Sequence, residues 1–496
     1  MLAITGMQFH DLIETFTQQD IDLTRVFNDV AVFNTQVKDP AHMESVASLA
    51  CRSALSKRGV AHLSIANDVQ EQALSEAKRS KRNQPGHVPN RWFEGRRLPT
   101  ERDIDEAAAL LNGASRVMVL AGRGALGASA ELERTADLLA APVAKALLGK
   151  VVLPDEHPHS TGGIGMLGTL PSQEAMERCD ALLIVGSAFP YIEYYPKPGQ
   201  AKGVQIDREG QRIGLRYPVA VGLVGDAGGT LRLLNEKLTR KSDRGFLEEA
   251  QAGMIRWREM MEAVASKTGV PLKPQFVARA FGRRLPDDAI LVTDSGQNTE
   301  LAARHIDMRE GQAFGVSGSL ASMACGLPYA IAAGIAFPNR PIFAVVGDGG
   351  LAMQLGEFST AVRYGIPLKM LVIKNNMLNQ IVWEQMMFLG NPQFGCELQP
   401  IDFAMAAEAM GGIGYSITQP DQVEEVLDRA FATEGPVLIQ AVVDAAEPMM
   451  PPKMPPDYAA NFRKALPGTP GHEQIEAAIA EEPLKTIMEA GGNRHG

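Results

Sequence analysis

The sequence predicts an α/β protein with three domains, each built on a doubly wound parallel sheet. Short apolar runs alternate with helical patterns along most of the chain, and this alternation is typical of parallel sheets. The 496 residues are too many for one hydrophobic core and suit about three domains. The 48 glycines fit an architecture that needs many tight turns between strands and helices.

The first predicted domain covers residues 1–80. Its opening segment, "LAITG", is predicted to be the end of a buried strand that turns at Gly6, and a helix over 45–59 and a strand over 60–65 follow. A buried strand needs neighbours on both sides. Because none precedes this one, we expect the domain to lack its first half. The basic, proline-rich residues 81–99 are predicted to be a surface linker.

The second predicted domain covers residues 100–240. Helices are expected over 103–114 and 129–140, and strands over 116–122, 142–148, 181–186, 203–207 and 219–226. A charged helix over 230–251 leads out of this domain, and residues 241–270 are assigned to a helical linker. This order of elements predicts a second parallel sheet with helices on its faces.

The third predicted domain covers residues 271–445. Its strands are expected over 289–294, 341–348, 368–375 and 436–444, with a helix over 351–365. Residues 446–496 are assigned to a C-terminal tail. The proline-rich residues 445–458, which begin at the last residue of the domain, are expected to form an extended strap, and a final helix is expected near 472–489. The glutamates of that helix disfavour an anionic bilayer, so any membrane contact is expected to be peripheral.

Composition excludes several classes of function. The net charge of -10 disfavours nucleic acid as a partner. Four scattered cysteines form no C-x-x-C pair and fit reduced thiols. No apolar run reaches the ~20 residues of a membrane helix, and no signal peptide is evident, so a cytoplasmic location is expected.

The segment "VVGDGGLAMQLGEF…VIKNN" is the strongest chemical signal. Asp348 ends one predicted buried strand and Asn375 ends the next, so both side chains are expected at the carboxyl edge of one sheet. Gly347, Gly349 and Gly350 would let a phosphate approach the backbone closely. Carboxylate and amide oxygens suit Mg²⁺ or Ca²⁺ held against a diphosphate. The alternative is a glycine-rich turn followed by a capping Asn.

This pattern resembles the thiamine diphosphate enzyme family, and within it the pyruvate oxidase and pyruvate:quinone dehydrogenase branch, with acetolactate synthase as a cousin. The segments that carry the resemblance include "TGGIGMLGT", "GSAFPYIEYYPKPGQAK", "VQID", "RIGLRYPV", "GDGG" and "WEQMMFLGNPQFGCELQPIDFA". The resemblance implies a Pyr domain, a central flavin-type domain and a PP domain that binds thiamine diphosphate. It also implies an active site between subunits of a homodimer or homotetramer.

The resemblance assigns roles in the PP domain. Asp348, Asn375 and the carbonyl of Met377 would bind the metal, and Met323 would be the apolar wedge under the cofactor, unless it only fills the core. Glu384, Gln380 and Ile381 would face the substrate, and Gln19 would reach the cofactor region of a partner subunit. The thiamine diphosphate residues are Ser295, Gly296, Gln297, Asn298, Ala321, Ser322, Met323, Asp348, Gly349, Gly350, Asn375, Asn376, Met377, Leu378 and Asn379. Asn379 departs from the glycine common in relatives, and an exposed helical Glu is the plainer interpretation of Glu384.

The turn "AGRGALG" matches G-x-G-x-x-G, but the next strand ends without the acidic residue that NAD binding requires. The resemblance instead implies FAD, bound by Gly122, Arg123, Gly124, Met166, Leu167, Gly168, Thr169, Phe189, Pro190, Tyr191, Ile192, Glu193 and Asp207. The alternative is a central domain of the same fold without flavin.

The expected function is decarboxylation of a 2-oxo acid, with pyruvate the first candidate, using thiamine diphosphate and Mg²⁺. FAD would pass electrons to a quinone or O₂. The alternatives are carboligation, as in acetolactate synthase, and a non-catalytic cofactor-binding subunit. The activating Glu of the family precedes the "LAITG" strand, so no residue here is assigned to it. An internal start of a longer frame, a truncation, or a separate chain carrying the missing half would each account for this.

Overall fold

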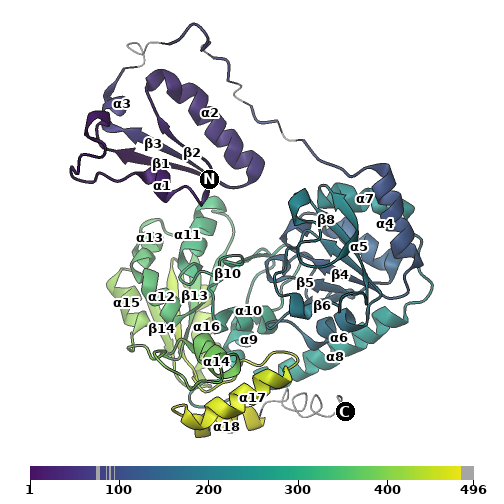
Figure 1. Cartoon of the computed structure of the whole chain (residues 1–496). Helices are drawn as coiled ribbons and strands as arrows, with labels where there is room; N and C mark the ends of the chain where they lie inside the picture. Colours follow the sequence, from purple (N-terminus) through teal and green to yellow (C-terminus); the bar gives the residue numbers. More distant parts are fainter. Residues whose placement is uncertain (74–78, 85, 89–90, 94, 482–496) are drawn as a thin grey trace. The chain divides into compact units, whose positions relative to one another are not determined.

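The computed structural model describes residues 1–73, 79–84, 86–88, 91–93 and 95–481 (Figure 1). They form two compact units, residues 1–95 and residues from Arg96 onward. The structure contains three parallel α/β sheets, one in the first unit and two in the second, as the sequence predicts. Among the described residues, no helix has the length and apolar character needed to cross a membrane.

The first unit is a three-stranded parallel sheet with the order β1-β3-β2. Its elements are β1 (Leu2–Met7), α1 (Leu23–Val26), β2 (Ala31–Val37), α2 (Pro40–Lys57), β3 (Val60–Ala66) and α3 (Asn67–Glu71). The prediction that β1 is buried was wrong for this unit, because β1 lies at the edge, pairs only with β3 and leaves Ile4 60% exposed. Helix α2 begins five residues earlier than predicted, because Asp39 caps it and Pro40 fits its first turn.

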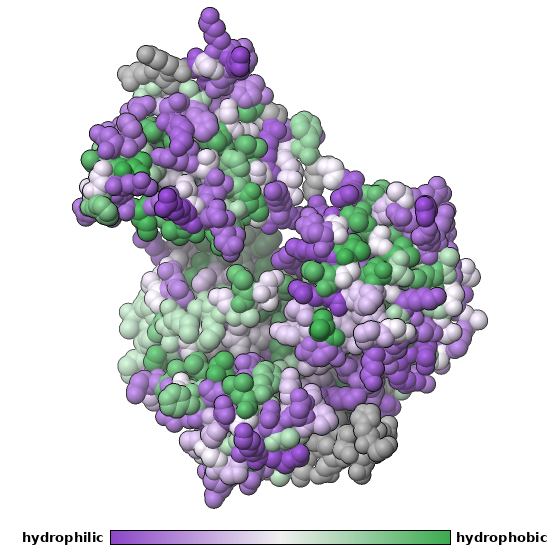
Figure 2. Space-filling model, in the orientation of Figure 1, coloured by the Kyte–Doolittle hydropathy of each residue, from purple (hydrophilic) through white to green (hydrophobic). Residues whose placement is uncertain are grey.

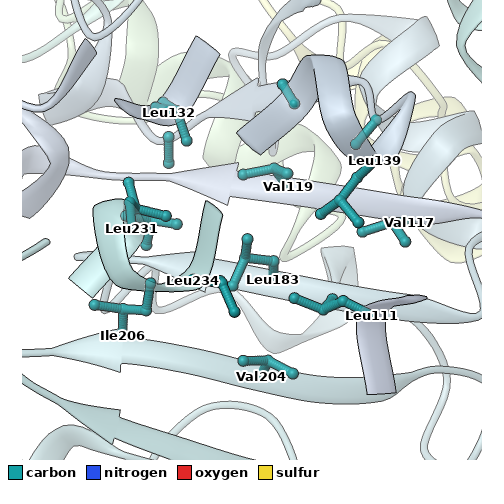
Figure 3. Packing of buried hydrophobic residues seen from close by; sticks show 14 of the residues in the cluster. Leu111, Val117, Val119, Leu132, Leu139, Leu183, Val204, Ile206, Leu231 and Leu234 are labelled. Atoms are coloured by element: carbon teal, nitrogen blue, oxygen red, sulfur yellow. The ribbon is translucent and has the colours of Figure 1, made fainter. Parts of the chain in front are cut away.

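The central sheet has the strand order β6-β5-β4-β7-β8-β9, all parallel. Its elements are α4 (Glu101–Gly113), β4 (Val117–Ala121), α5 (Ser129–Leu139), β5 (Val143–Lys145), β6 (Ser160–Gly163), α6 (Leu170–Arg178), β7 (Ala181–Val185), β8 (Lys202–Asp207), β9 (Val219–Val224) and α7 (Ala227–Lys237). Alternate strand residues such as Val117 and Val119 pack against α4, α5 and α7 on one face (Figure 3). Met118 and Leu120 pack toward α6 on the other face. From β4 the chain adds β5 and β6 on one side of the sheet and then β7, β8 and β9 on the other side. Ligands of such sheets bind at this reversal of strand order, between β4 and β7.

The third sheet has the order β11-β10-β12-β13-β15-β14. Its elements are α9 (Pro274–Arg283), β10 (Ile290–Thr293), α10 (Gln297–His305), β11 (Ala313–Gly315), α11 (Gly326–Ala336), β12 (Ile342–Gly347), α12 (Asp348–Gln354), α13 (Phe358–Arg363), β13 (Leu368–Lys374), α14 (Asn379–Met387), α15 (Phe403–Ala409), β14 (Ile413–Ile417), α16 (Gln422–Ala432) and β15 (Val437–Val442). Helices α9, α10 and α16 cover one face, and α11, α12, α13 and α15 cover the other. Strands β2, β6, β11 and β14 were not predicted from the sequence.

Three predicted helical or extended segments differ in the structure. The helix predicted over 230–251 is two helices, α7 and α8 (Gly245–Ala265), because Lys241 and Arg244 bind α4 and α5 and hold the intervening turn. The helix predicted over 351–365 contains a 3₁₀ turn, η7 (Leu355–Glu357), between α12 and α13. The proline-rich strap ends at Pro455, and α17 (Pro456–Ala465) follows it because Pro fits a first helical turn.

The final predicted helix begins as expected at α18 (His472–Glu481), and its residues 482–489 lie outside the described residues. Helices α8, α14, α17 and α18 share one methionine-rich core with the strap. This core contains Met254, Met261, Met386, Met387, Met449, Met450, Met454, Trp257 and Trp383. It joins the third sheet to the rest of the second unit.

Lys369 on β13 is 6% exposed, and its ammonium donates to the carbonyls of Thr433 and Gly435 (2.5 and 2.8 Å). Burial lowers its pKa from 10.5 to about 8. Between these values the unfolded chain binds the proton and the folded chain does not, so the free energy of unfolding rises with pH in this window. Relative to a Lys369→Met variant, the wild type should gain up to about 3 kcal/mol from pH 8 to pH 10.5. Denaturant unfolding across this range measures it, and parallel pH profiles for the two proteins would contradict it.

Candidate functional site

The carboxylate of Asp348 lies at the carboxyl edge of the third sheet, where α12 begins directly after β12. Its Oδ1 accepts a hydrogen bond from Gly349 N (2.8 Å), and its Oδ2 accepts from Asn375 N (3.0 Å) and Asn376 N (2.6 Å). Burial raises the pKa of this carboxyl, although the three backbone donors oppose the shift. These bonds fix the turn after β12 against the turn after β13.

The turn after β13 brings Asn375 and Met377 to the same place. The Oδ1 of Asn375 accepts from Met377 N (3.0 Å), so the amide oxygen and the Met377 backbone lie side by side. Asn376 has a φ of 57°, a left-handed conformation that Asn tolerates better than most residues. The predicted metal-binding set of Asp348, Asn375 and Met377 is therefore brought together by two adjacent parallel strands.

The donor set fits a hard divalent cation. Three hydrogen bonds occupy three of the about four lone-pair sites of the Asp348 carboxylate, so one remains for a metal. An amide oxygen and a backbone carbonyl complete a set of oxygen ligands of the kind that Mg²⁺ and Ca²⁺ prefer. No group of three or more His, Cys, Asp or Glu that could hold a metal occurs within the described ranges, so a metal here depends on these neutral oxygens.

Gly349 and Gly350 contribute no side chains to the N-terminus of α12, and both are buried. A Cβ at Gly349 would lie 2.8 Å from Leu378 Cδ2 and 3.0 Å from Leu398 Cδ1, with Met323 Cε at 3.8 Å. A Cβ at Gly350 would lie 2.5 Å from Asp294 Oδ2. Neither position accepts a larger residue without displacement of its neighbours, so the backbone at the N-terminus of α12 packs closely against these groups.

Asp294 was not predicted from the sequence. It is 1% exposed, its Oδ1 accepts from Ser295 N (2.7 Å), and its Oδ2 has no hydrogen-bond partner. Burial raises its pKa. The signal that identified Asp348, an aspartate directly after a buried strand, is also present at Asp294.

Gln297, in the predicted Ser295–Asn298 turn, joins the parts of this site. Its Oε1 accepts from Asn375 Nδ2 (3.3 Å) and from Asn379 Nδ2 (3.0 Å), and its Nε2 donates to Glu447 O (3.4 Å). Asn298 is 3% exposed, and its amide donates to the carbonyls of Asp294, directly after β10, and of Val345 on β12. Gly296 has a φ of 142°, which favours glycine there.

The remaining predicted residues of this domain lie around the two turns. Met323 is half-buried beside Gly349, in a segment where Ala321 has a φ of 46°. Ser322 N donates to Ser317 Oγ (3.0 Å). On α14, Gln380 Nε2 donates to Glu384 Oε1 (2.7 Å).

Asn379 is 4% exposed and turns its amide toward Gln297, whereas Ile381, on the same helix, is 39% exposed. Gln19 belongs to the first unit and has a φ of 59°. Its assignment to the cofactor region of a partner subunit stays a prediction.

The second candidate site lies in the central sheet, where β4 and β7 end side by side. Gly124 N donates to Gly186 O (2.9 Å), and a Cβ at Gly122 would lie 2.6 Å from the same oxygen. Gly186 follows β7 with a φ of 57° and was not among the predicted site residues. In the short turn after Gly122, Arg123 and Gly124 are exposed, and this turn lies where the strand order reverses.

The other predicted flavin residues belong to loops of the same domain. Asp207 ends β8, is 8% exposed, and accepts from Glu209 N (3.0 Å). Phe189 packs on Tyr191, Tyr194 and Tyr195. Ile192 and Glu193 form a short 3₁₀ turn after Pro190 and Tyr191. Thr169 caps α6, and Met166, Leu167 and Gly168 form the loop before it.

The fold of the second unit agrees with that of the thiamine pyrophosphate enzymes. Residues 294–441 match the C-terminal binding domain of the thiamine pyrophosphate enzymes, and residues 104–234 match the central domain of the same enzymes. The chain is 37% identical over 466 residues to the Bacillus subtilis protein YdaP, whose name describes it as thiamine pyrophosphate-containing, covering 94% of this chain and 79% of that protein. The chain therefore belongs to the thiamine pyrophosphate enzyme family.

Two further relatives carry names of specific enzymes. A protein of Methanocaldococcus jannaschii named as a probable acetolactate synthase large subunit is 30% identical over 475 residues, covering 91% of this chain and 78% of its own length. The pyruvate oxidase of Lactiplantibacillus plantarum is 27% identical over 498 residues, covering 99% of this chain and 81% of that enzyme. Proteins named as acetolactate synthase and as pyruvate oxidase are thus both among the relatives of this chain.

Proposed function

We propose that this protein decarboxylates a 2-oxo acid, with pyruvate the first candidate, using thiamine diphosphate and Mg²⁺, and passes electrons through FAD to a quinone or O₂. The observation that carries the proposal is the convergence of Asp348, Asn375 and Met377 beside Gly349 and Gly350 at one sheet edge. Oxygen ligands for a divalent cation and the two glycines that we assign to a diphosphate then lie in one place.

Each residue of this cluster has a proposed task. Asp348, Asn375 and the carbonyl of Met377 hold Mg²⁺, and Gly349, Gly350 and the Ser295–Asn298 turn face the diphosphate. Met323 supports the cofactor from below. Thiamine diphosphate supplies a carbon nucleophile and takes up the electrons released when CO₂ leaves. Glu384 lies within hydrogen-bond reach of Gln380 on α14, and we assign both, with Ile381, to the substrate side of the site.

We assign FAD to the central domain. The turns of Gly122–Gly124 and Gly186 lie at the strand-order reversal, and Asp207 ends the strand after β7 with a carboxylate that suits a ribose hydroxyl. The pyruvate oxidase relative favours this assignment. The proposed domains are 1–80 (Pyr), 100–240 (central) and 271–445 (PP), with linkers at 81–99 and 241–270 and a tail over 446–496.

The second candidate function is carboligation of two 2-oxo acids, and the acetolactate synthase relatives favour it. It would use the same thiamine diphosphate and metal residues. The two candidates differ in the fate of the electrons, because carboligation leaves the flavin oxidised and oxidation reduces it.

We also propose that the protein is a homodimer or homotetramer. Large apolar side chains are exposed on and beside α11, α12 and α13, among them Ile335 (57%), Phe337 (52%) and Met353 (58%). Figure 2 shows hydrophobic residues at the surface where α11 and α13 lie in Figure 1. Exposed apolar surface of this kind is typical of contacts between subunits.

The proposed function predicts that the purified protein, loaded with thiamine diphosphate, Mg²⁺ and FAD, loses its flavin absorbance when pyruvate is added without oxygen. Addition of a quinone or O₂ should restore the absorbance. Release of acetolactate with the flavin still oxidised would favour carboligation instead. Saturable uptake of the cofactors without either product would leave a cofactor-binding protein and would contradict both enzymatic proposals.

A further inference from the structure

Helix α10 connects the two candidate cofactor sites. Its first residue, Gln297, contacts Asn375 and Asn379 in the metal and diphosphate cluster. At the other end of the helix, Arg304 contacts the loop of Met166 and Gly168 in the central domain. Nine helical residues span only about 13 Å, so the two sites are joined by one short, rigid element.

Arg304 is held from several sides. Its side chain is 2% exposed, its Nε donates to Gly168 O (3.1 Å), and its Nη2 donates to Met166 O (2.7 Å). Its Nη1 donates to Met450 O (2.7 Å) and to Glu300 Oε1 (2.7 Å), one turn earlier on α10. The guanidinium also lies 5.8 Å from the centre of the Trp257 ring. Four directed hydrogen bonds from one planar fork fix both the helix and the loop.

A second contact holds the same end of α10. The carbonyl of Ala303 accepts from Lys150 Nζ (3.0 Å), and Lys150 also binds Asp155 (2.9 Å). Asp155 in turn binds Lys145 at the end of β5 (2.6 Å). The last turn of α10 is therefore attached both to the Met166–Gly168 loop and to the central sheet.

The loop Met166–Gly168, to which Arg304 donates hydrogen bonds, contains residues that we assign to FAD. Two of its backbone carbonyls are occupied by the guanidinium, so the orientation of Met166–Gly168 depends on where α10 lies. The position of α10 depends in turn on Gln297 and its two amide partners beside the metal cluster.

We propose that Arg304 is a positioning residue that couples the two cofactor sites, so that thiamine diphosphate with Mg²⁺ strengthens the binding of FAD and FAD strengthens the binding of thiamine diphosphate. The inference rests on the proposed function, because it requires both cofactors. Because α10 is rigid, a ligand that fixes the position of one end also fixes the position of the other end, and the coupling must be equal in both directions.

The test measures the Kd of FAD by quenching of its fluorescence, with and without saturating thiamine diphosphate and Mg²⁺. For the wild type we expect FAD to bind at least about 5-fold more tightly when the other cofactor is present. In Arg304→Met this ratio should fall to about 1-fold, whereas each cofactor alone still binds. Arg304→Lys keeps the charge and the contact with Glu300 but cannot hold both carbonyls, so it should lose most of the ratio, and it replaces Arg304→Met if that variant does not fold.

Arg284→Met is the matched control. Arg284 also binds backbone carbonyls and carboxylates, those of Ala280, Glu424 and Asp428, but on the side of the domain where α9 meets α16. Its loss should lower stability and leave the ratio unchanged. The coupling alone would be overturned if both Arg304 variants kept the wild-type ratio of FAD Kd values, or if the wild type bound FAD equally well with and without thiamine diphosphate and Mg²⁺. Absence of any FAD uptake by the wild type would instead overturn the flavin assignment, and the coupling with it.

Discussion

Replacing Asp348 with alanine is expected to weaken the binding of thiamine diphosphate in the presence of Mg²⁺ by at least about 100-fold, or about 3 kcal/mol. The substitution removes the only anionic oxygens of the proposed metal set. It also leaves the backbone N–H groups of Gly349, Asn375 and Asn376 without their acceptor. The two turns that form the site then lose their common attachment. Calorimetric titration of the cofactor at fixed Mg²⁺ measures the effect.

The control for this variant is Asp402→Ala in the same domain. Asp402 caps α15, accepts from Met405 N (3.0 Å) and binds Gln440, so its loss costs local stability without touching the cluster. We expect Asp402→Ala to lower the unfolding temperature and to bind the cofactor as the wild type does. Equal affinities for Asp348→Ala and Asp402→Ala would show that Asp348 does not hold the metal.

The sequence was sufficient for the features that depend on local pattern. The strand before Asp348 is a continuous apolar run, and the strand before Asn375 is apolar except for Lys369 and Lys374. The carboxyl ends of parallel strands meet at one edge of a sheet, so the neighbourhood of these residues could be predicted. Three parallel sheets followed from the same alternation.

Features that depend on contacts between distant segments could not be predicted in this way. The break between α7 and α8 arises because Lys241 and Arg244 bind α4 and α5. Strand β1 is exposed because it pairs with β3 on one side and with no strand of this unit on the other. Arg304 was missed because nothing in its local sequence shows that its acceptors, Met166 and Gly168, come from another domain.

The importance of Gly186 also could not be predicted from its local sequence, because it depends on a contact with a distant turn. It follows β7 as an ordinary strand-ending glycine, yet a Cβ there would lie 2.4 Å from Gly124 Cα and 2.6 Å from Gly124 C. Those atoms are backbone, so they cannot rotate away as a flexible side chain would. Gly124 N also donates to Gly186 O (2.9 Å), so the two turns cannot separate without loss of that bond.

Gly186→Ala should therefore destabilise the central domain by about 3 kcal/mol, from left-handed strain at φ 57° and from the overlap with Gly124. This corresponds to a fall of roughly 6–12 °C in the apparent Tm. Gly214→Ala is the matched control, because Gly214 has a φ of 75° but nothing within 4 Å of its Cβ position, so only strain remains. Its Tm should fall by roughly 2–4 °C. If FAD binds at this turn, Gly186→Ala should also weaken FAD binding about 10-fold, whereas equal losses in the two variants would mean that the close approach of the β4 and β7 turns does not matter.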